Sequence, residues 1–305
     1  MNAARVTLRA CAKINWTLEV LGRRSDGYHE VRTILQTIDL ADELALRSPD
    51  RSGAGRDTLR VAVPAGWDVP VGEGNLIEKA RTLLAASHPS WRWAETLRVE
   101  LQKCIPPAAG LGGGSSDAAA FLRGCECLRA STEAEALERL ATRIGSDVPF
   151  FLRGGTQLAS GRGEVLEALP NAPTTWLVLV TPPLSLGRKT ERLYSLLEAE
   201  HFSDGSRTDA VAQALRQGRA PEPASLANTF EQVAGNAFPG LAGYRRSLTE
   251  TCGFALLSGA GPALFSPVAD RGAAEEAVAD LTKQRVPAQI ARTMTAAEST
   301  AYRLG

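Results

Sequence analysis

The chain has 305 residues, of which 44% are hydrophobic and 22% charged, and its 34 basic and 34 acidic side chains cancel. This balance argues against a nucleic-acid-binding protein, and the lack of a run of about 18 apolar residues argues against a membrane span. The length suits two domains. Five cysteines without a C-x-x-C pair, and no apolar signal-peptide core near residue 1, predict a cytoplasmic protein.

Strict alternation opens the chain, with hydrophobic residues at every even position from 6 to 20. This period of two predicts a strand with one buried face, and it places Lys13 and Asn15 together on the opposite face. A turn cluster follows at 21–30. The first half is then predicted to contain strands at 31–40, 44–47, 59–63 and 97–101, and helices at 75–86, 116–128 and 133–144.

The second half is predicted to begin near residue 155, which gives domains 1–155 and 156–305. Residues 203–224 are polar and rich in Pro, Gly, Ser and Arg, which is typical of a mobile connection. Because strands and helices do not alternate regularly, the pattern favours an α+β fold over a doubly wound sheet. The predicted elements are strands at 176–180, 254–257, 263–265 and 286–291, and helices at 228–235, 240–251 and 271–284.

A glycine-rich string, Gly110-Leu111-Gly112-Gly113-Gly114-Ser115-Ser116-Asp117, lies between a predicted strand and a predicted helix. Glycine allows positive φ and close approach of the backbone to a ligand, and a helix N-terminus offers free N–H groups. The string therefore predicts an anion cradle suited to a triphosphate, although a glycine-rich turn before a capped helix would have the same pattern. It is neither a Walker A loop nor a Rossmann fingerprint, because no Gly-Lys-Ser/Thr follows and Ser115 occupies the third glycine position.

Several motifs, in the same order along residues 8–266, resemble those of known kinases. Residues 106–120, Asn75-Leu76-Ile77 and Ser258-Gly259-Ala260-Gly261-Pro262 resemble motifs of the galactokinase, homoserine, mevalonate and phosphomevalonate kinase superfamily. Other motifs resemble the diphosphocytidyl-methylerythritol kinase family within it: Ala12-Lys13-Ile14-Asn15, residues 22–30, Gly145-Ser146-Asp147-Val148-Pro149-Phe150-Phe151, Gly161-Arg162-Gly163-Glu164 and Asn228-Thr229-Phe230-Glu231.

The resemblance implies a two-domain α+β small-molecule kinase with its active site in the cleft between the domains. The implied reaction is ATP-dependent phosphorylation of the 2-hydroxyl of a cytidine diphosphate-linked methylerythritol, with Mg²⁺, in the non-mevalonate isoprenoid pathway. Phosphoryl transfer depends on positioning and charge stabilisation. Asp147 is implied as the general base and Lys13 as the stabilising cation. On pattern alone, Asp147 could instead be a turn or cap residue and Lys13 a solvated strand residue.

The resemblance also assigns binding residues. Asn15, Tyr28, His29 and Tyr194 are implied to bind the acceptor, with His29 at the cytosine edge and the two tyrosines as aromatic faces. Two roles stay open for Ser116, a contact to Mg²⁺ or only a helix cap. The residues implied to cradle the ATP phosphates are Pro106, Pro107, Ala108, Ala109, Gly110, Leu111, Gly112, Gly113, Gly114, Ser115 and Ser116.

The expected partners are small molecules, without nucleic acid or membrane, and the expected assembly is a monomer or weak homodimer. The chain departs from the family at Ala108 and Ala109, where glycine is frequent, and the segment 186–190 is slightly longer than usual. Two alternatives remain: a kinase of the same superfamily for a smaller alcohol, and a nucleotide-binding homologue without catalysis.

Overall fold

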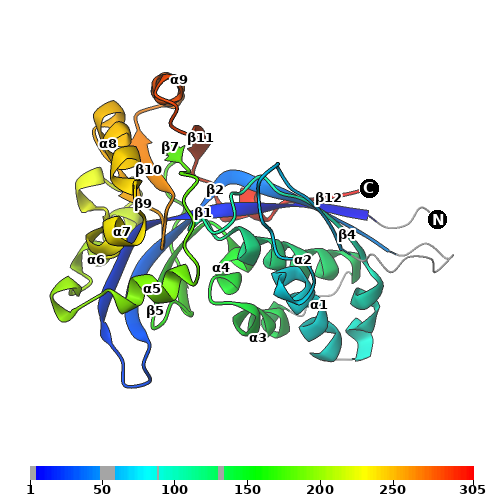
Figure 1. The fold of residues 1–305 in the computed structure, drawn as a ribbon. Helices are drawn as coiled ribbons and strands as arrows, with labels where there is room; N and C mark the ends of the chain where they lie inside the picture. Colours follow the sequence, from blue (N-terminus) through cyan, green and yellow to red (C-terminus); the bar gives the residue numbers. More distant parts are fainter. Residues whose placement is uncertain (1–4, 49–58, 88, 130–133) are drawn as a thin grey trace.

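The computed structural model describes residues 5–48, 59–87, 89–129 and 134–305 (Figure 1). Its central feature is an antiparallel hairpin of two 19-residue strands, β1 (Arg5–Arg23) and β2 (His29–Arg47), which runs through both halves of the molecule. The predicted break between strands 31–40 and 44–47 is wrong. Asp42 lies in β2 opposite Ala10, and its carboxylate accepts a backbone N–H from Ile105, so a polar residue is accommodated within a continuous strand.

The hairpin is the core of the larger sheet, which has eight strands among the described residues. The order is β12-β1-β2-β4-β3, with β5 pairing with β2 and β6, and β8 pairing with β1. The sheet therefore includes strands from both sides of residue 155, where the predicted domain boundary stays a prediction. The added strands are β3 (Leu59–Ala62), β4 (Arg98–Gln102), β5 (Thr156–Ser160), β6 (Val165–Ala168), β8 (Ala227–Asn228) and β12 (Tyr302–Leu304).

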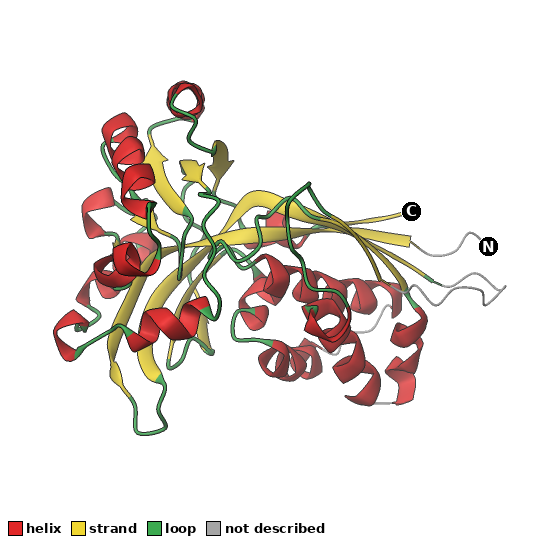
Figure 2. Ribbon diagram, in the orientation of Figure 1, coloured by secondary structure: helices red, strands yellow, loops and turns green. Residues whose placement is uncertain are grey.

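Helices cover one face of this sheet at the end where β3 and β4 lie (Figure 2). Their buried side chains form a core with Leu8 and Leu46 of the hairpin, including the fully buried Phe121. A Cβ on Gly124 would lie 2.2 Å from Leu46 Cδ1, so glycine allows the helix to approach the sheet. The helices are α1 (Leu76–Ser87), α2 (Gly113–Arg129), α3 (Ala134–Ile144) and α4 (Val148–Arg153).

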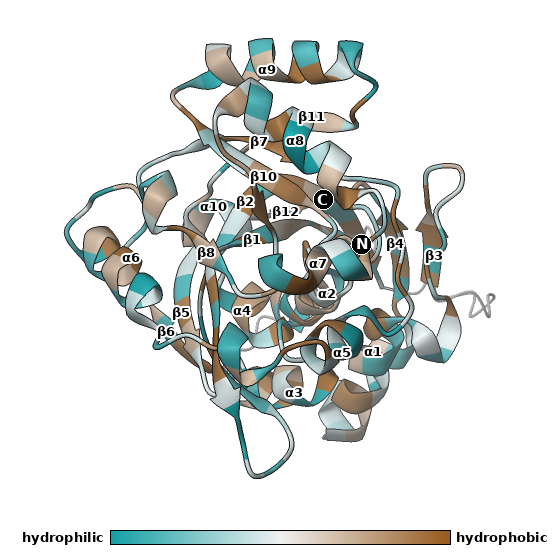
Figure 3. Ribbon diagram, turned by 60° about the vertical axis from the view of Figure 1, so that its left-hand side comes forward, coloured by the Kyte–Doolittle hydropathy of each residue, from teal (hydrophilic) through white to brown (hydrophobic). Residues whose placement is uncertain are grey.

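A second sheet, in the order β11-β7-β10-β9, forms the other end of the molecule. The mainly hydrophobic strand β10 lies beneath helices α8 and α9 (Figure 3). Within the described ranges, no helix is both long and apolar enough to span a bilayer. The strands of this sheet are β7 (Trp176–Val180), β9 (Leu256–Leu257), β10 (Leu264–Val268) and β11 (Ala288–Arg292). The remaining helices are α5 (Lys189–Ser195), α6 (Ser206–Arg216), α7 (Glu231–Ala237), α8 (Leu241–Cys252), α9 (Arg271–Lys283) and α10 (Ala296–Thr300), of which α6 and α10 pack against β1 and β2.

Helix α6 corrects the prediction of a mobile connection at 203–224. Its buried residues Thr208, Val211, Ala212 and Leu215 recur at helical spacing, and they pack against β1 and β2. The polar composition of the segment reflects its exposed face. The spacing of these four residues, three or four positions apart, is the pattern that would have predicted a helix here.

The hairpin is buried on both faces over residues 10–20, where one buried face was predicted. The polar face is covered by later parts of the chain and is satisfied by hydrogen bonds. The Thr208 backbone N–H donates to Glu19 Oε2 at 2.7 Å, and the Thr208 hydroxyl donates to Thr17 Oγ1 at 2.9 Å. Alternation thus predicted the strand correctly but not the cover over its second face.

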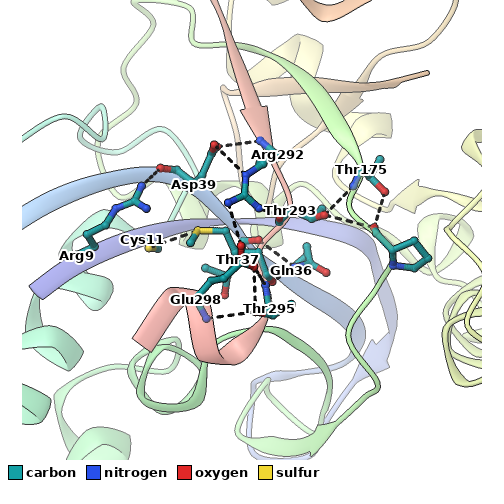
Figure 4. Close-up of polar contacts among 12 residues, drawn as sticks. Arg9, Cys11, Gln36, Thr37, Asp39, Thr175, Arg292, Thr293, Thr295 and Glu298 are labelled. Carbon is teal, nitrogen blue, oxygen red and sulfur yellow. Dashed lines mark hydrogen bonds and ion pairs between the residues drawn. The ribbon is translucent and has the colours of Figure 1, made fainter. Parts of the chain in front are cut away.

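The last segment of the chain returns to the middle of β2 (Figure 4). The Arg292 backbone N–H donates to Asp39 Oδ1 at 2.8 Å, and the Gln36 side-chain amide donates to the Met294 carbonyl at 2.9 Å. Beyond α10, β12 pairs with β1. The first and last strands of the described ranges therefore lie side by side in one sheet.

Candidate active site

The glycine-rich loop joins β4 to α2, and α2 begins at Gly113, three residues earlier than predicted. Gly110 and Gly112 have φ of 87° and 76°, a region that L side chains rarely adopt. A Cβ on Gly112 would lie 2.6 Å from Phe151 Cζ, so the loop also lies too close to α4 for a side chain. The first N–H groups of a helix have no intrahelical partner, so α2 presents donors at the loop.

A cavity of about 380 Å³ opens beside this loop. Of the eleven residues predicted to cradle ATP phosphates, all but Leu111 and Ser116 line it. Leu111 is buried in the core, and its carbonyl accepts the backbone N–H of Lys13 at 3.0 Å. Thr190 and Ala260 also line it, so both halves of the sequence contribute to the cavity.

Lys13 and Asp147, the predicted catalytic pair, both line this cavity. Lys13 is buried, and its Nζ donates to Asn15 Oδ1 at 2.6 Å, as expected for alternate residues on one strand face. Burial lowers the pKa of Lys13, while the negative charge of Asp147 opposes that shift. Asp147 is half-buried at the N-cap position of α4, but its side chain makes no capping hydrogen bond, so its carboxylate is available to the cavity.

The C-terminal glycine loop, residues 258–262, closes over Lys13. A Cβ on Gly259 would lie 2.8 Å from Lys13 Nζ and 3.3 Å from Asn15 Oδ1, so glycine is required for this approach. The Asn228 side-chain amide supports the loop from below by donating to the carbonyls of Leu257 and Gly259, each at 2.8 Å. Two motifs far apart in the sequence therefore meet at the catalytic lysine candidate.

Three aromatic side chains, those of His29, Tyr194 and Phe230, pack against one another near this site. The rings of His29 and Tyr194 stack with centroids 4.7 Å apart and an interplanar angle of 18°, and Tyr194 also packs edge-on against Phe230. Burial and the charge of Arg23 lower the pKa of His29, so its ring is neutral at pH 7, with one donor and one acceptor nitrogen. Burial and the charge of Asp147 raise the pKa of Tyr194 to about 12.

Tyr28 lies apart from this stack. Its ring is 56% exposed on the turn between β1 and β2, and the Arg162 guanidinium lies 4.6 Å from the ring centroid. The structure thus brings His29 and Tyr194 together and leaves Tyr28 in a separate cation–π pair.

A buried charged group lies at the start of α2 and was not predicted. Lys103 Nζ is hydrogen-bonded to Asp42 Oδ2, and to Asp117 Oδ2 at 2.7 Å. Burial, assisted by Asp42 and opposed by Lys103, raises the pKa of Asp117. Lys103 and Asp117 line the cavity, and a Cβ on Gly113 would lie 3.3 Å from Lys103 Nζ. The group therefore supports the loop from its inner side.

Lys189 was also missed by the sequence reasoning. Its Nζ donates to the carbonyls of Ala108 and Gly261, at 2.6 and 2.5 Å. Three of the chain's five lysines, Lys13, Lys103 and Lys189, line the cavity, so the scarcity of lysine was the signal that could have found them.

Ser116, considered for Mg²⁺, has a buried hydroxyl that donates to the Cys11 carbonyl at 2.7 Å. Ser115 lines the cavity in its place. Among the described side chains, no cluster of three or more His, Cys, Asp or Glu residues is arranged for a metal ion.

Comparison with known proteins defines the class. Residues 75–155 match the GHMP kinases N terminal domain, and residues 211–287 match the GHMP kinases C terminal domain. A homoserine kinase from Cytophaga hutchinsonii has the same fold, with a TM-score of 0.68 at 14% identity over 100% of this chain and 98% of its own. The fold and the two matched segments define a GHMP kinase, an enzyme class that uses ATP as phosphate donor.

More similar relatives narrow the assignment. A 4-diphosphocytidyl-2-C-methyl-D-erythritol kinase from Pelotomaculum thermopropionicum is 41% identical over 90% of this chain and 93% of its own length, and one from Moorella thermoacetica is 39% identical over 95% and 99%. A crystal structure of 4-(cytidine 5'-diphospho)-2C-methyl-D-erythritol kinase superposes with a TM-score of 0.76 at 31% identity, covering 94% of this chain and 98% of that one. The chain belongs to the 4-diphosphocytidyl-2-C-methyl-D-erythritol kinase family.

Proposed function

We propose that this kinase transfers the γ-phosphoryl group of ATP to the 2-hydroxyl of 4-diphosphocytidyl-2-C-methyl-D-erythritol, in the non-mevalonate route to isoprenoid precursors. One observation carries the proposal: Lys13 and Asp147 line the same cavity as the glycine-rich loop. The stacked rings of His29 and Tyr194 support an acceptor that carries a base. The names of the similar kinases support the same substrate.

The donor nucleotide is proposed to lie along the loop. Glycines 110, 112, 113 and 114 leave the backbone open to the phosphates, and the α2 N-terminus offers N–H donors and the positive end of its dipole. These groups are fixed by the fold before the nucleotide arrives. Preorganised donors of this kind stabilise the charge that spreads over the transferred group.

In the proposed reaction, the oxygen of the acceptor hydroxyl attacks the γ-phosphorus as the bond from that phosphorus to the β-phosphate oxygen breaks. The hydroxyl proton passes to the Asp147 carboxylate, and ADP leaves with the bonding electron pair. Lys13 stabilises the charge on the transferred group, and Asn15 holds the Lys13 ammonium in place. The buried surroundings of Lys13 strengthen this electrostatic interaction.

The acceptor is proposed to place its cytosine at the aromatic group. Bases are commonly held by stacking on aromatic rings and by hydrogen bonds to their polar edges. Tyr194 and Tyr28 are the proposed aromatic faces, and the neutral His29 ring offers the donor and acceptor for the cytosine edge. The Tyr28 ring is 56% exposed and has the Arg162 guanidinium 4.6 Å from its centroid, so the face that Arg162 does not cover is the one proposed to contact the base.

Mg²⁺ is proposed to bind with the nucleotide. When bound, it would neutralise part of the charge of the phosphates. The Ser115 hydroxyl and the Asp147 carboxylate face the cavity and are oxygen donors of the kind that Mg²⁺ prefers. The hydroxyl of Ser116 supports this role less well, because it already donates to the Cys11 carbonyl.

We further propose that segments 1–155 and 156–305 act as the two domains that form this cleft. The monomer or weak homodimer and the cytoplasmic location remain predictions of the sequence.

The test is ADP release by the purified chain with ATP and Mg²⁺ on a panel of acceptors. The panel contains 4-diphosphocytidyl-2-C-methyl-D-erythritol, mevalonate, phosphomevalonate, homoserine and galactose. We expect turnover only with the cytidylylated acceptor. Turnover only with another alcohol would overturn the assigned substrate. No ADP release with any of the five acceptors would favour a nucleotide-binding homologue without catalysis.

A further inference from the structure

Lys189 lies at the seam between the two glycine loops. It is the first residue of α5. Its Nζ donates to the carbonyl of Ala108, in the loop of residues 106–116 that is proposed to bind the ATP phosphates (the phosphate loop), and to the carbonyl of Gly261 in the C-terminal glycine loop. The loops also contact each other directly, because the Ser258 hydroxyl donates to the Gly110 carbonyl at 3.3 Å. Just after the C-terminal loop, the Ala263 backbone N–H donates to the Ala109 carbonyl at 3.0 Å. Lys189 therefore contacts both loops where they border the nucleotide cavity.

The ammonium of Lys189 has capacity beyond these two contacts. A lysine ammonium has three donors, and two of them are used on the carbonyls of Ala108 and Gly261. Lys189 also lines the same cavity as Lys13 and Asp147. The two carbonyls fix the position of the charge and leave one donor for an occupant of the cavity.

Several charged groups lie near Lys189, on β1, before α4 and at the start of its own helix. Burial, followed by the positive charge of Lys13, lowers the pKa of Lys189 to about 7, and Asp147 opposes the shift. Arg188, the N-cap residue of α5, is exposed and paired with Glu191 at 2.7 Å.

Lys103 and Asp117 also line the cavity, but they are paired with each other, and Lys103 is paired with Asp42 as well. Besides this group, two cations, Lys13 and Lys189, and one carboxylate, Asp147, line the cavity. A charged phosphate in the cavity would favour the protonated form of Lys189.

We propose that Lys189 is a phosphate-binding residue that contacts the transferred γ-phosphoryl group of the nucleotide from the C-terminal half of the chain. The proposal rests on the kinase function proposed above and adds a residue to its site. Lys13 and the phosphate loop come from the N-terminal half, so Lys189 would make nucleotide binding depend on both halves. A lysine that only joined the two loops would contribute equally to every nucleotide that needs an ordered loop.

That difference defines the experiment. Affinities for ADP and for a non-hydrolysable ATP analogue are measured by calorimetry with Mg²⁺ at pH 6.5, for the wild-type chain, Lys189→Met, Lys189→Arg and the surface control Lys283→Met. We expect Lys189→Met to weaken binding of the analogue at least tenfold more than binding of ADP, because only the analogue loses a hydrogen bond between its γ-phosphate and a charged group. Lys189→Arg should retain most of the preference, and Lys283→Met should match wild type.

Equal weakening for both nucleotides, or none, would overturn the proposal, since only a residue at the γ-phosphate distinguishes them. Thermal unfolding of each variant checks that a loss of affinity is not a loss of fold.

The pH dependence gives a second readout when it is measured for both nucleotides, because a lysine that only joined the loops would affect the ATP analogue and ADP alike. Above pH 7 the wild-type residue loses its proton before binding, whereas an arginine guanidinium stays charged. The ratio of wild-type to Lys189→Arg affinity for the ATP analogue should therefore fall between pH 7 and 9, and more than the same ratio for ADP. A constant ratio, or an equal fall for both nucleotides, would contradict the proposal.

Neither measurement uses an acceptor. If the wild-type chain binds nucleotide but phosphorylates none of the five alcohols, the proposed substrate fails, and the role of Lys189 is still decided by the affinities alone.

Discussion

The Lys13 ammonium lies 2.6 Å from Asn15 Oδ1, and this contact is the end of a chain of hydrogen bonds within the hairpin. The Asn15 amide donates to the Thr33 hydroxyl at 2.8 Å, and that hydroxyl donates to the Thr17 carbonyl at 2.5 Å. The backbone of β1 thereby fixes the orientation of the Asn15 amide. The buried ammonium is positioned by the strand that carries it.

The first prediction concerns the charge of Lys13. Lys13→Met keeps the length of the side chain and removes the cation, so we expect kcat to fall about 10²–10³-fold with the acceptor that proves active. Because burial disfavours the charged form of Lys13, the thermal unfolding temperature should not fall substantially. Lys283→Met, on the exposed face of α9, is the control. Turnover near the wild-type rate would remove Lys13 from the mechanism.

The second prediction separates nucleotide binding from proton transfer. Asp147→Asn removes the proposed base but preserves the shape of the turn before α4, so we expect kcat to fall about 10²–10⁴-fold. ATP affinity, measured by calorimetry, should stay within a few-fold of wild type. The matched control is Asp280→Asn on the surface of α9. Retained turnover in Asp147→Asn, with the control unaffected, would exclude Asp147 as the base.

The third prediction distinguishes the two tyrosines. Stacking of a base on an aromatic ring contributes about 1–3 kcal/mol, so Tyr194→Ala should raise the KM for the cytidylylated acceptor about 5–150-fold. The KM for ATP should change little, and Tyr194→Phe should keep most of the affinity. Tyr28→Ala is expected to have the smaller effect, because its ring is paired with Arg162. A larger effect of Tyr28→Ala would show that the turn closes on the base.

The fourth prediction concerns stability and pH. The pKa of Asp117 is raised above its usual value of 3.8, so the folded state binds this proton more strongly than the unfolded state. Its contribution is therefore fully present below about pH 4 and is lost as pH rises towards the raised pKa, at up to about 1.4 kcal/mol per pH unit. Urea unfolding from pH 5 to 8 should show that Asp117→Asn removes this decline.

Asp280→Asn again serves as control for the urea experiment. Parallel stability curves for wild type and Asp117→Asn would show that the Asp117 carboxyl has no linked proton. A second variant, Lys103→Met, leaves two buried carboxyls without their cation and should cost about 3–5 kcal/mol near neutral pH.

Local patterns predicted most of the elements that carry the candidate site. Alternation over residues 6–20 gave β1 and the shared face of Lys13 and Asn15, and the glycine string gave the loop before α2. Both depend on neighbours within a few positions, where backbone geometry alone decides which side chains share a face. The motif order also placed the chain in its family, which the similar kinases confirm.

Contacts between distant segments could not be predicted in the same way. The His29–Tyr194 stack, the Lys189 contacts to two loops and the Lys103–Asp42–Asp117 group all join positions that only the tertiary fold brings together. The polar face of β1 is buried for the same reason, since its cover comes from α6 and the Gly259 loop. The composition of residues 203–224 led to a wrong prediction for α6, because its exposed polar residues are more numerous than its four buried residues.

The pairing of β1 with both β8 and β12 has a consequence for the order of folding during synthesis. Strand β1 pairs with β2 at short sequence separation, but its pairing with residues 227–228 and 302–304 must wait until those residues have been synthesised. Contacts of such large sequence separation slow folding. We therefore expect Lys13 to stay exposed in the nascent hairpin until the later segments have folded over it. Neither half of the chain alone should then have kinase activity.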